Sequence, residues 1–291
     1  MQDVMPFNKA DATVDTARTA TTPFAGSTLI DRFAREADVI GVGIAARGAL
    51  NLPALNDMFF DAALQVTDHQ SFRTIAIEDT PASAERFNDY VSGGNNDLSR
   101  AMAGAFRPWR SQQFAKFLAT LKARSRDVRF VGVDTDASEP DEGFAMGVAE
   151  LVRRVGRVLY LGGVAHVAAA PVQISGEDSQ RQPFGHLLRQ RLPDVTYKAL
   201  AVTVGDVLDE KATHTVPLEA EALFTSSRLG SHWVEPSVAG ELLRWFCSPR
   251  SMLAVGPVFD DSNLGRHHMV IQPTAFDAIA FLKEAKREMT S

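Results

Sequence analysis

Four short apolar runs constrain the fold of this chain more than any other feature. Each is rich in Val and Ile and leads through polar or glycine residues into a stretch of helical periodicity, and together with their first turns they lie at residues 39–48, 72–78, 128–134 and 157–162. Such runs are typical of strands that are buried on both faces. Strands that alternate with helices favour a parallel sheet with crossover helices. The sequence therefore predicts an α/β fold, in which a mostly parallel central sheet is flanked by helices.

The ends of these strands carry side chains with useful chemistry. They are Arg47, Glu78, Asp79, Asp134, Asp136 and His166. In open parallel sheets, ligands bind in the crevice outside the carboxyl ends of the strands. We therefore expect a functional site at this edge of the sheet.

The chain is predicted to form one domain. Residues 1–25 show no hydrophobic period and are expected to be a flexible leader, and residues 26–291 are expected to form a single α/β domain. A mainly helical insertion is predicted at about residues 81–126. Phe114 and Phe117 recur there at helical spacing, which predicts that they lie in the core.

The pattern of the C-terminal half is less regular. Residues 173–183 are predicted to be a polar loop or a flexible lid, and residues 205–236 show no regular period. Short strands are expected near 252–255 and 269–272, and a helix at 276–289 is expected to close the chain.

Composition excludes several classes of protein. The net charge is −6 and basic residues form no tail, so neither nucleic acid nor a membrane surface is an expected partner. The single cysteine, Cys247, cannot form a disulfide within the chain and lies in an apolar stretch, where we expect a buried structural thiol. A reducing compartment, the cytoplasm, is the predicted location. No apolar stretch is long enough for a transmembrane helix.

Common catalytic motifs are scarce. Gly41-x-Gly43-x-x-Ala46 follows a predicted strand and resembles a dinucleotide-binding fingerprint, but the next acidic strand end, Glu78, is further away than that fingerprint requires. The chain has no Gly-x-Ser-x-Gly elbow, no phosphate-binding Walker loop and no His-Glu-x-x-His motif. We predict no cofactor and no metal site. The absence of these motifs does not exclude a bound metal ion or haem group.

His166 is the strongest candidate for an acid or base, because it follows a strand within a glycine-rich turn at the expected crevice. Asp134 is predicted to orient it, the alternative being a helix cap. Glu78 ends a buried strand and needs a partner, for which Arg47 is a candidate, either in a structural ion pair or in a substrate contact. The His267-His268 pair is expected in a solvated loop.

With these residues assembled, the chain resembles the erythromycin esterase family, which belongs to a wider group with haem-binding ChaN-like and Tiki-like proteins. The resemblance covers about residues 29–170 and resumes more weakly at 184–205 and 252–284. It is carried by segments at similar spacing to the family's own blocks, namely GIAARG, FRTIAIE, NDYVSGG, VRFVGVD, GGVAHV and FDAIAFL.

The departures from this family concern its chemistry. By the resemblance, Ile44 stands where the family has a Glu, and Arg47 stands where it has its catalytic His. Asn51 and Asn56 replace a Glu and an Arg of the next helix, and Gly163 replaces the first His of a later pair. Arg47 cannot serve as a base at neutral pH. The resemblance therefore implies a conserved scaffold with a rewritten site.

We expect an enzyme acting on a small organic molecule, with His166, Glu78 and Asp134 as catalytic residues. Substrate binding is assigned to Arg47, Asn51, Asp136 and His186. The resemblance implies ester or lactone hydrolysis, and a lyase, dehydratase or cyclase of specialised metabolism is the other enzymatic possibility. A small-molecule-binding pseudo-enzyme and an NAD(P)-dependent oxidoreductase are the alternatives. The oligomeric state is left open.

Overall fold

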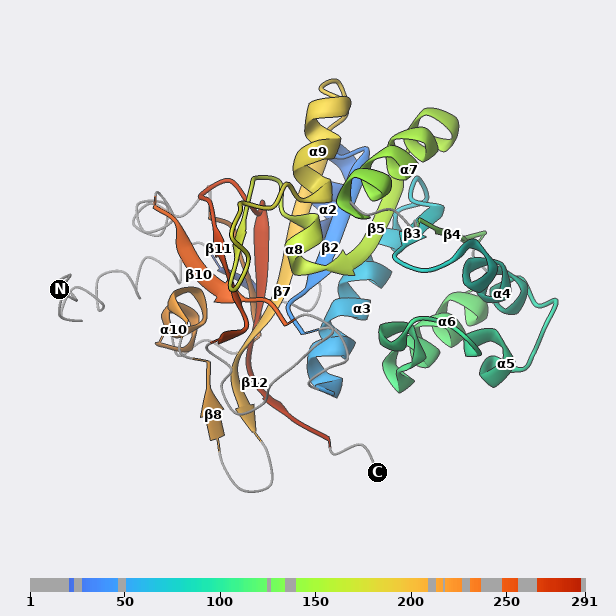
Figure 1. The fold of residues 1–291 in the computed structure, drawn as a ribbon. Coiled ribbons are helices and arrows are strands. Elements are labelled where there is room, and N and C mark those ends of the chain that lie inside the picture. The colour runs from blue at the N-terminus through green and yellow to red at the C-terminus, as the bar shows by residue number, and fades with distance from the viewer. Residues whose placement is uncertain are drawn as a thin grey trace, which may run out of the picture.

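The four strands predicted at 39–48, 72–78, 128–134 and 157–162 meet in one nine-stranded sheet in the computed structural model of the chain (Figure 1). Its strand order is β1-β9-β12-β7-β2-β5-β3-β4, and β8 pairs with β7 beside this path. The structure describes residues 21–23, 28–46, 51–124, 127–133, 140–208, 213–216, 218–226, 231–236, 248–255 and 266–288.

The middle of the sheet is parallel, as predicted. All five pairings from β12 to β4 along the strand order are parallel, whereas β1 on β9, β9 on β12 and β8 on β7 are antiparallel. The strands are β1 Thr21–Pro23, β2 Val39–Ile44, β3 Thr74–Ile77, β4 Arg129–Gly132, β5 Val158–Gly163, β7 Tyr197–Leu208, β8 Thr213–Thr215, β9 His232–Val234 and β12 Ala278–Lys286. The α/β fold class with a mostly parallel central sheet is confirmed.

Helices cover both faces of this sheet (Figure 1). One face carries α3, which packs on β2, β5, β7 and β12, and α2, which packs on α3. The other face carries α7, α8 and α9, which contact β5, β2 and β7. The bounds of these helices are α2 Thr28–Glu36, α3 Pro53–Asp68, α7 Pro140–Val155, α8 Val164–Val167 and α9 Phe184–Arg191. Strands covered on both faces need apolar side chains throughout, and all six residues of β2 are buried.

The segment between β3 and β4 is helical. It contains α4 Pro81–Val91, α5 Leu98–Met102, the 3₁₀ helix η2 Arg107–Arg110 and α6 Gln112–Ala123. Phe114 and Phe117 are buried, as predicted, and their rings pack with Phe60 of α3 and Trp109 of η2. This aromatic cluster fixes the helices of the segment against the edge of the sheet.

The prediction of a C-terminal helix at 276–289 is wrong. Residues Ala278–Lys286 form β12, which lies between β7 and β9. Residues 278–281 are fully buried because neighbouring strands and packed layers surround them. A short strand that is buried on both faces shows no alternation of apolar and polar residues. Periodicity therefore does not distinguish it from a buried helix. Within the stretch predicted to be a flexible leader, Thr21–Pro23 forms a strand that pairs with β9.

A second, three-stranded sheet forms in the C-terminal half. It contains β10 Arg250–Leu253, β11 His268–Ile271 and β6 Gln173–Ile174, and all its pairings are antiparallel. The predicted polar loop at 173–183 therefore begins with a strand, and a backbone bridge between Val172 and Arg181 closes it. The irregular region 205–236 continues β7 and adds β8, β9 and the helix α10 Glu219–Ser226.

Candidate active site

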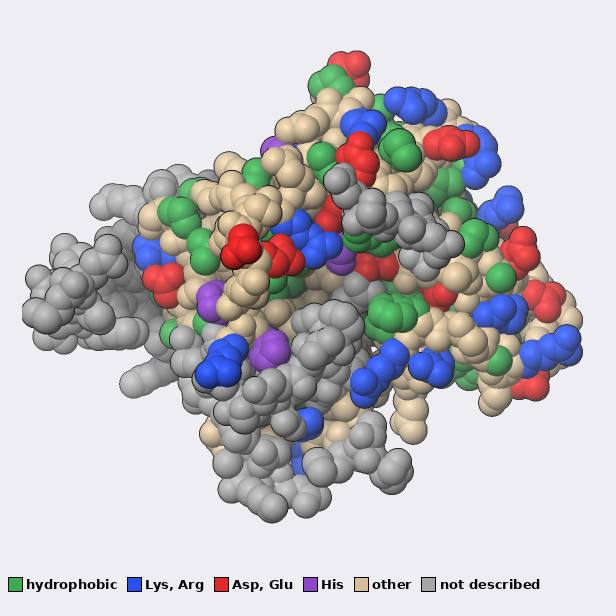
Figure 2. Space-filling view, in the orientation of Figure 1, with side chains coloured by type: hydrophobic (Ala, Val, Ile, Leu, Met, Phe, Trp, Pro, Cys, Tyr) green, Lys and Arg blue, Asp and Glu red, His purple; other side chains and the backbone are tan. Residues whose placement is uncertain are grey.

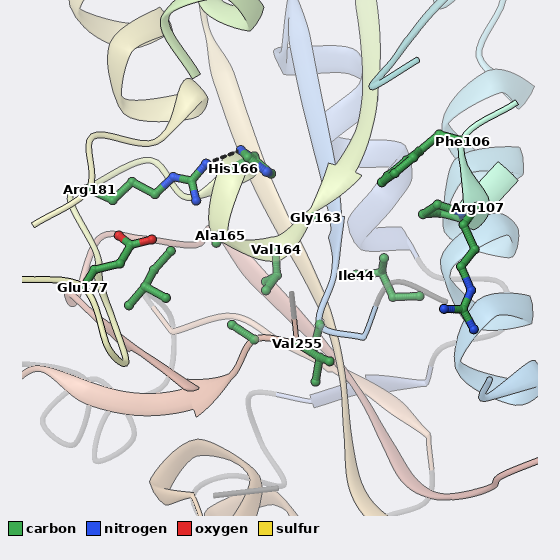
Figure 3. A pocket seen from close by; sticks show the side chains of 14 residues that line it. Ile44, Phe106, Arg107, Gly163, Val164, Ala165, His166, Glu177, Arg181 and Val255 are labelled. Carbon is green, nitrogen blue, oxygen red and sulfur yellow. Dashed lines mark hydrogen bonds between the residues drawn. The ribbon is translucent and has the colours of Figure 1, made fainter. Parts of the chain in front are cut away.

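A cavity of about 270 Å³ opens at the carboxyl ends of β2 and β5 (Figure 3). The described residues that line it come from the ends of these strands, from α8, from the helical insertion, from β6 and the loop after it, and from the segment that follows β10. They are Ile44, Ala45, Phe106, Arg107, Pro108, Gly163, Val164, Ala165, His166, Ile174, Glu177, Arg181, Ala254 and Val255. This is the edge of the sheet at which the sequence predicted a site.

The surface around this region carries both signs of charge. Figure 2 shows the face on which α8 and the end of β5 lie, with a hollow near its middle that acidic, basic, histidine and apolar side chains border. The described part of this face therefore has a mixed electrostatic character.

His166 is held at the cavity by an acidic partner. It lies on α8, which begins directly after β5, so the strand fixes the position of the helix. Its Nδ1 atom lies 2.7 Å from Oδ1 of Asp141, in the first turn of α7. The ring also packs edge-on against Phe144, one turn further along α7. Two neighbouring elements thus fix the orientation of the imidazole.

Asp141 receives two further hydrogen bonds. Arg181 Nε donates to Oδ2 at 2.6 Å, and the backbone N–H of Phe184 donates to Oδ1 at 2.9 Å. Arg181 Nη2 also lies 3.2 Å from His166 Nδ1 (Figure 3). A guanidinium only donates, and the Nδ1–Oδ1 distance is the shorter of the two, so we assign the ring proton to Nδ1. Nε2 of His166 then keeps a lone pair that can accept a proton.

The pKa of Asp141 is lowered from its ordinary value. Burial raises this pKa, but the hydrogen bond and charge interaction with His166 and the interactions with Arg181 outweigh it. The carboxylate is therefore ionised at neutral pH. An ionised carboxylate on Nδ1 is the arrangement that holds a catalytic imidazole in one tautomer.

Glu78 lies beside this arrangement and supports the turn between β5 and α8. Its Oε1 accepts hydrogen bonds from the hydroxyl of Tyr160 at 2.7 Å and from the backbone N–H of Gly163 at 3.2 Å. A Cβ atom at Gly162 would collide with the same oxygen, which explains the glycine there. Glu78 thus contacts the backbone of a cavity residue.

The glycines of the apparent dinucleotide fingerprint have a different use. Both Gly41 and Gly43 lie inside β2, not in a turn that could hold a pyrophosphate. A Cβ at Gly41 would collide with the hydroxyl of Tyr197, and one at Gly43 with Val167 and the backbone of α8. The Tyr197 hydroxyl donates to the carbonyl of Val167 at 2.6 Å. The glycines therefore let α8 and its supporting tyrosine pack close to the strand.

The other residues assigned from sequence are scattered or not described. Arg47, Asp134 and Asp136 lie outside the described residues, and so does Cys247. Asn51 donates from Nδ2 to the carbonyl of Glu288 at 2.7 Å, so it links the segment before α3 to the segment after β12.

His186 of α9 does not line the cavity, and its Nε2 accepts a hydrogen bond from Gln190 at 2.8 Å. His268 opens β11, and its carbonyl accepts a hydrogen bond from the backbone of Ser175.

Sequence reasoning missed Asp141 and Arg181. Pro140 marks the start of a helix, and Asp141 shares the buried face of that helix with Phe144, Ala145 and Val148. A carboxylate on the apolar stripe of a helix near its start was therefore a usable signal. Arg181 carried no such signal, because its neighbours along the chain are polar and the bridge to Val172 brings it to the site.

Two absences apply to the described residues only. No three of their His, Cys, Asp or Glu side chains gather as a metal site would require. None of their helices combines the length and the apolar character needed to cross a membrane.

Comparisons with known proteins agree with this architecture. The model of the family described as erythromycin esterase matches residues 67–155. A crystal structure of a protein from Bacillus cereus has the same fold, with a TM-score of 0.72 at 10% identity, covering 97% of this chain and 99% of that one. No curated protein matches the chain in sequence.

Two further solved structures are similar. A succinoglycan biosynthesis protein aligns with a TM-score of 0.71 at 12% identity, covering 96% of this chain and 98% of that one. A mutant of the erythromycin esterase EreC in its open conformation aligns with a TM-score of 0.62 at 13% identity, covering 90% and 94%. At these identities, the likeness concerns the fold.

Proposed function

We propose that this chain, which is similar to the erythromycin esterase family over residues 67–155 and to an erythromycin esterase in its fold, is a hydrolase that cleaves an ester or lactone bond in a small organic molecule. The single observation that carries the proposal is the 2.7 Å contact between His166 Nδ1 and the buried Asp141 carboxylate at the wall of the cavity. His166 is the proposed general base.

Water is the proposed nucleophile. None of the described lining residues carries a hydroxyl or thiol side chain, so they offer no serine-type or cysteine-type nucleophile. Nε2 of His166 takes a proton from the water as its oxygen bonds to the carbonyl carbon. The imidazolium then returns that proton to the leaving oxygen as the ester bond breaks, which regenerates the neutral ring.

Asp141 and Glu78 are positioning residues in this scheme. Asp141 keeps the ring proton on Nδ1 and stabilises the imidazolium that forms. Arg181 and the N–H of Phe184 hold the carboxylate in place, so His166 needs no rearrangement during the reaction. Glu78 holds Gly163 and thereby the start of α8. Arg47, which lies outside the described residues, keeps its predicted role in substrate binding.

The test compares wild type with His166→Ala on a panel of simple esters and lactones. We expect turnover by wild type and a loss of about a hundredfold or more in kcat/KM in the variant, since general bases contribute about 10²–10⁴. His69→Ala, a histidine at the end of α3 that bonds Asp31, is the matched control and should keep full activity. Absence of ester and lactone turnover by folded wild type would overturn the proposal.

A further inference from the structure

The cavity is small and mostly apolar around its catalytic histidine. Its volume of about 270 Å³ lies below the ~300–1,000 Å³ of sites that hold drug-sized ligands. A macrolide with its appended sugars is at the large end of these drug-sized ligands, so it would need a larger cavity. Ile44, Val164 and Val255 supply buried apolar walls close to His166. A ligand that fills this space must therefore be small and must carry an apolar group.

Phe106 stands out on this wall because a large apolar side chain is left exposed. It is 46% exposed, although its backbone is tightly held. Its N–H donates to Oδ2 of Asp79 at 2.8 Å, and its carbonyl accepts from the N–H of Trp109 at 2.9 Å. The indole of Trp109 in turn donates to the carbonyl of Glu78 at 3.0 Å. The residues directly after β3 thus fix the backbone that carries this ring at the cavity.

The ring faces the histidine across the cavity. Figure 3 shows Phe106 directed inward from the insertion side, with His166 and Arg181 on the opposite side. An apolar group that lies against Phe106 would place the bond next to it near His166. An exposed aromatic side chain at a concave site is typical of a ligand contact.

The charges around the cavity favour an uncharged ligand. The guanidinium of Arg181 is paired with Asp141, and Figure 3 shows that of Arg107 directed away from His166. Glu177, the acidic residue among the described lining, would repel an anion. The described wall therefore offers no dedicated partner for a carboxylate or a phosphate.

We propose that the substrate is an uncharged ester or lactone with a short apolar acyl chain that lies against Phe106, and that a macrolide-sized ester is not a substrate. The inference rests on the proposed function, because it names the molecule that His166 acts on. Phe106 is the residue that determines specificity for chain length.

Binding of amides tests this inference separately from hydrolysis. The probes are acetamide, butyramide and hexanamide, which resemble the acyl part of esters but resist cleavage, and affinity is measured by ligand-observed NMR titration. We expect affinity to rise by about fourfold per added methylene, the equivalent of ~0.8 kcal/mol for each buried CH₂. Phe106→Ala should weaken hexanamide binding by about tenfold, and Phe106→Leu should restore most of it.

Met146→Ala is the matched control, because Met146 is an exposed apolar residue of α7 that does not line this cavity. It should leave all three affinities unchanged. Erythromycin should neither bind nor be cleaved. Affinity that ignores chain length or Phe106, absence of amide binding, or cleavage of erythromycin would overturn the inference. Chain-length-dependent binding without turnover of any ester would instead support the ligand class and overturn hydrolysis.

Discussion

Two buried carboxyl groups in this molecule have opposite ionisation behaviour. Asp141, the partner of His166, is 6% exposed and Glu221 of α10 is fully buried, yet the pKa of Asp141 is lowered and burial raises that of Glu221 to about 7. Asp141 accepts from a guanidinium, an imidazole and a backbone N–H. The comparison shows that the difference between the two pKa values follows from the charge of the hydrogen-bond donors more than from the extent of burial.

The hydrogen-bond donors that the structure describes for Glu221 are all neutral. Its Oε1 accepts from the hydroxyl of Thr203 at 2.6 Å and from the N–H of Leu253 at 3.1 Å, and its Oε2 has no hydrogen-bond partner in the described part of the chain. The side chain of Glu221 therefore connects α10 with β7 and β10. Its surroundings favour the protonated form of its carboxyl group. The interactions of Asp141 keep its carboxylate ionised beside a histidine, and a charged group with a shifted pKa of this kind is expected of a catalytic site.

The largest expected effect comes from removing the charge of Asp141. Asp141→Asn should lower kcat/KM for the best ester of the panel by about 10²–10⁴, because the amide can hold Nδ1 in the wrong tautomer. Steady-state kinetics on a variant whose circular dichroism matches wild type would measure this. A variant within threefold of wild type would show that Asp141 has only a structural role.

Glu221 should dominate the pH dependence of stability near neutrality. A raised pKa in the folded state stabilises the fold below the ordinary value of 4.5, and this contribution is lost as pH rises towards about 7. The loss amounts to about 3 kcal/mol at 1.36 kcal/mol per pH unit. Glu221→Gln, which mimics the protonated acid, should flatten this slope in urea unfolding. An unchanged slope would contradict the raised pKa.

Asp141 should affect stability with the opposite sign. Its lowered pKa stabilises the fold above the ordinary carboxyl range, and this contribution is lost as pH falls through the folded-state value. Asp141→Asn should cost about 1.5–3 kcal/mol at neutral pH, the size of a hydrogen bond to a charged group. The difference from wild type should shrink in acid, and a difference that grows there would refute the account.

A smaller effect is expected at the support beneath α8. Tyr197→Phe removes the hydroxyl that donates to Val167 and should cost about 1 kcal/mol, measured as a lower unfolding free energy. Tyr90→Phe on α4 is the control. Because α8 carries His166, the Tyr197 variant should also lose some ester turnover while its KM stays close to wild type. Loss of stability with full turnover would mean that α8 is positioned by β5 alone.

The sequence predicted the parallel sheet well, because each of its four runs is a strand with apolar residues on both faces. The same property made β12 resemble a helix, since burial on both sides leaves no alternation to detect. The sequence placed His166 at the crevice because a strand end followed by glycines marks that edge of the sheet, and His166 does line the cavity there. Asp141 was missed because its role depends on the packing of α7 beside α8, and Arg181 because a backbone bridge brings it there.

NMR of the ring nitrogens of His166 tests the central claim most directly. The account predicts that the neutral imidazole carries its proton on Nδ1, hydrogen-bonded to Asp141, with Nε2 unprotonated and able to accept a proton from water. Asp141→Asn should then populate the other tautomer. A neutral wild-type ring protonated on Nε2 would contradict the account, because His166 would have no lone pair directed away from Asp141 with which to act as the base.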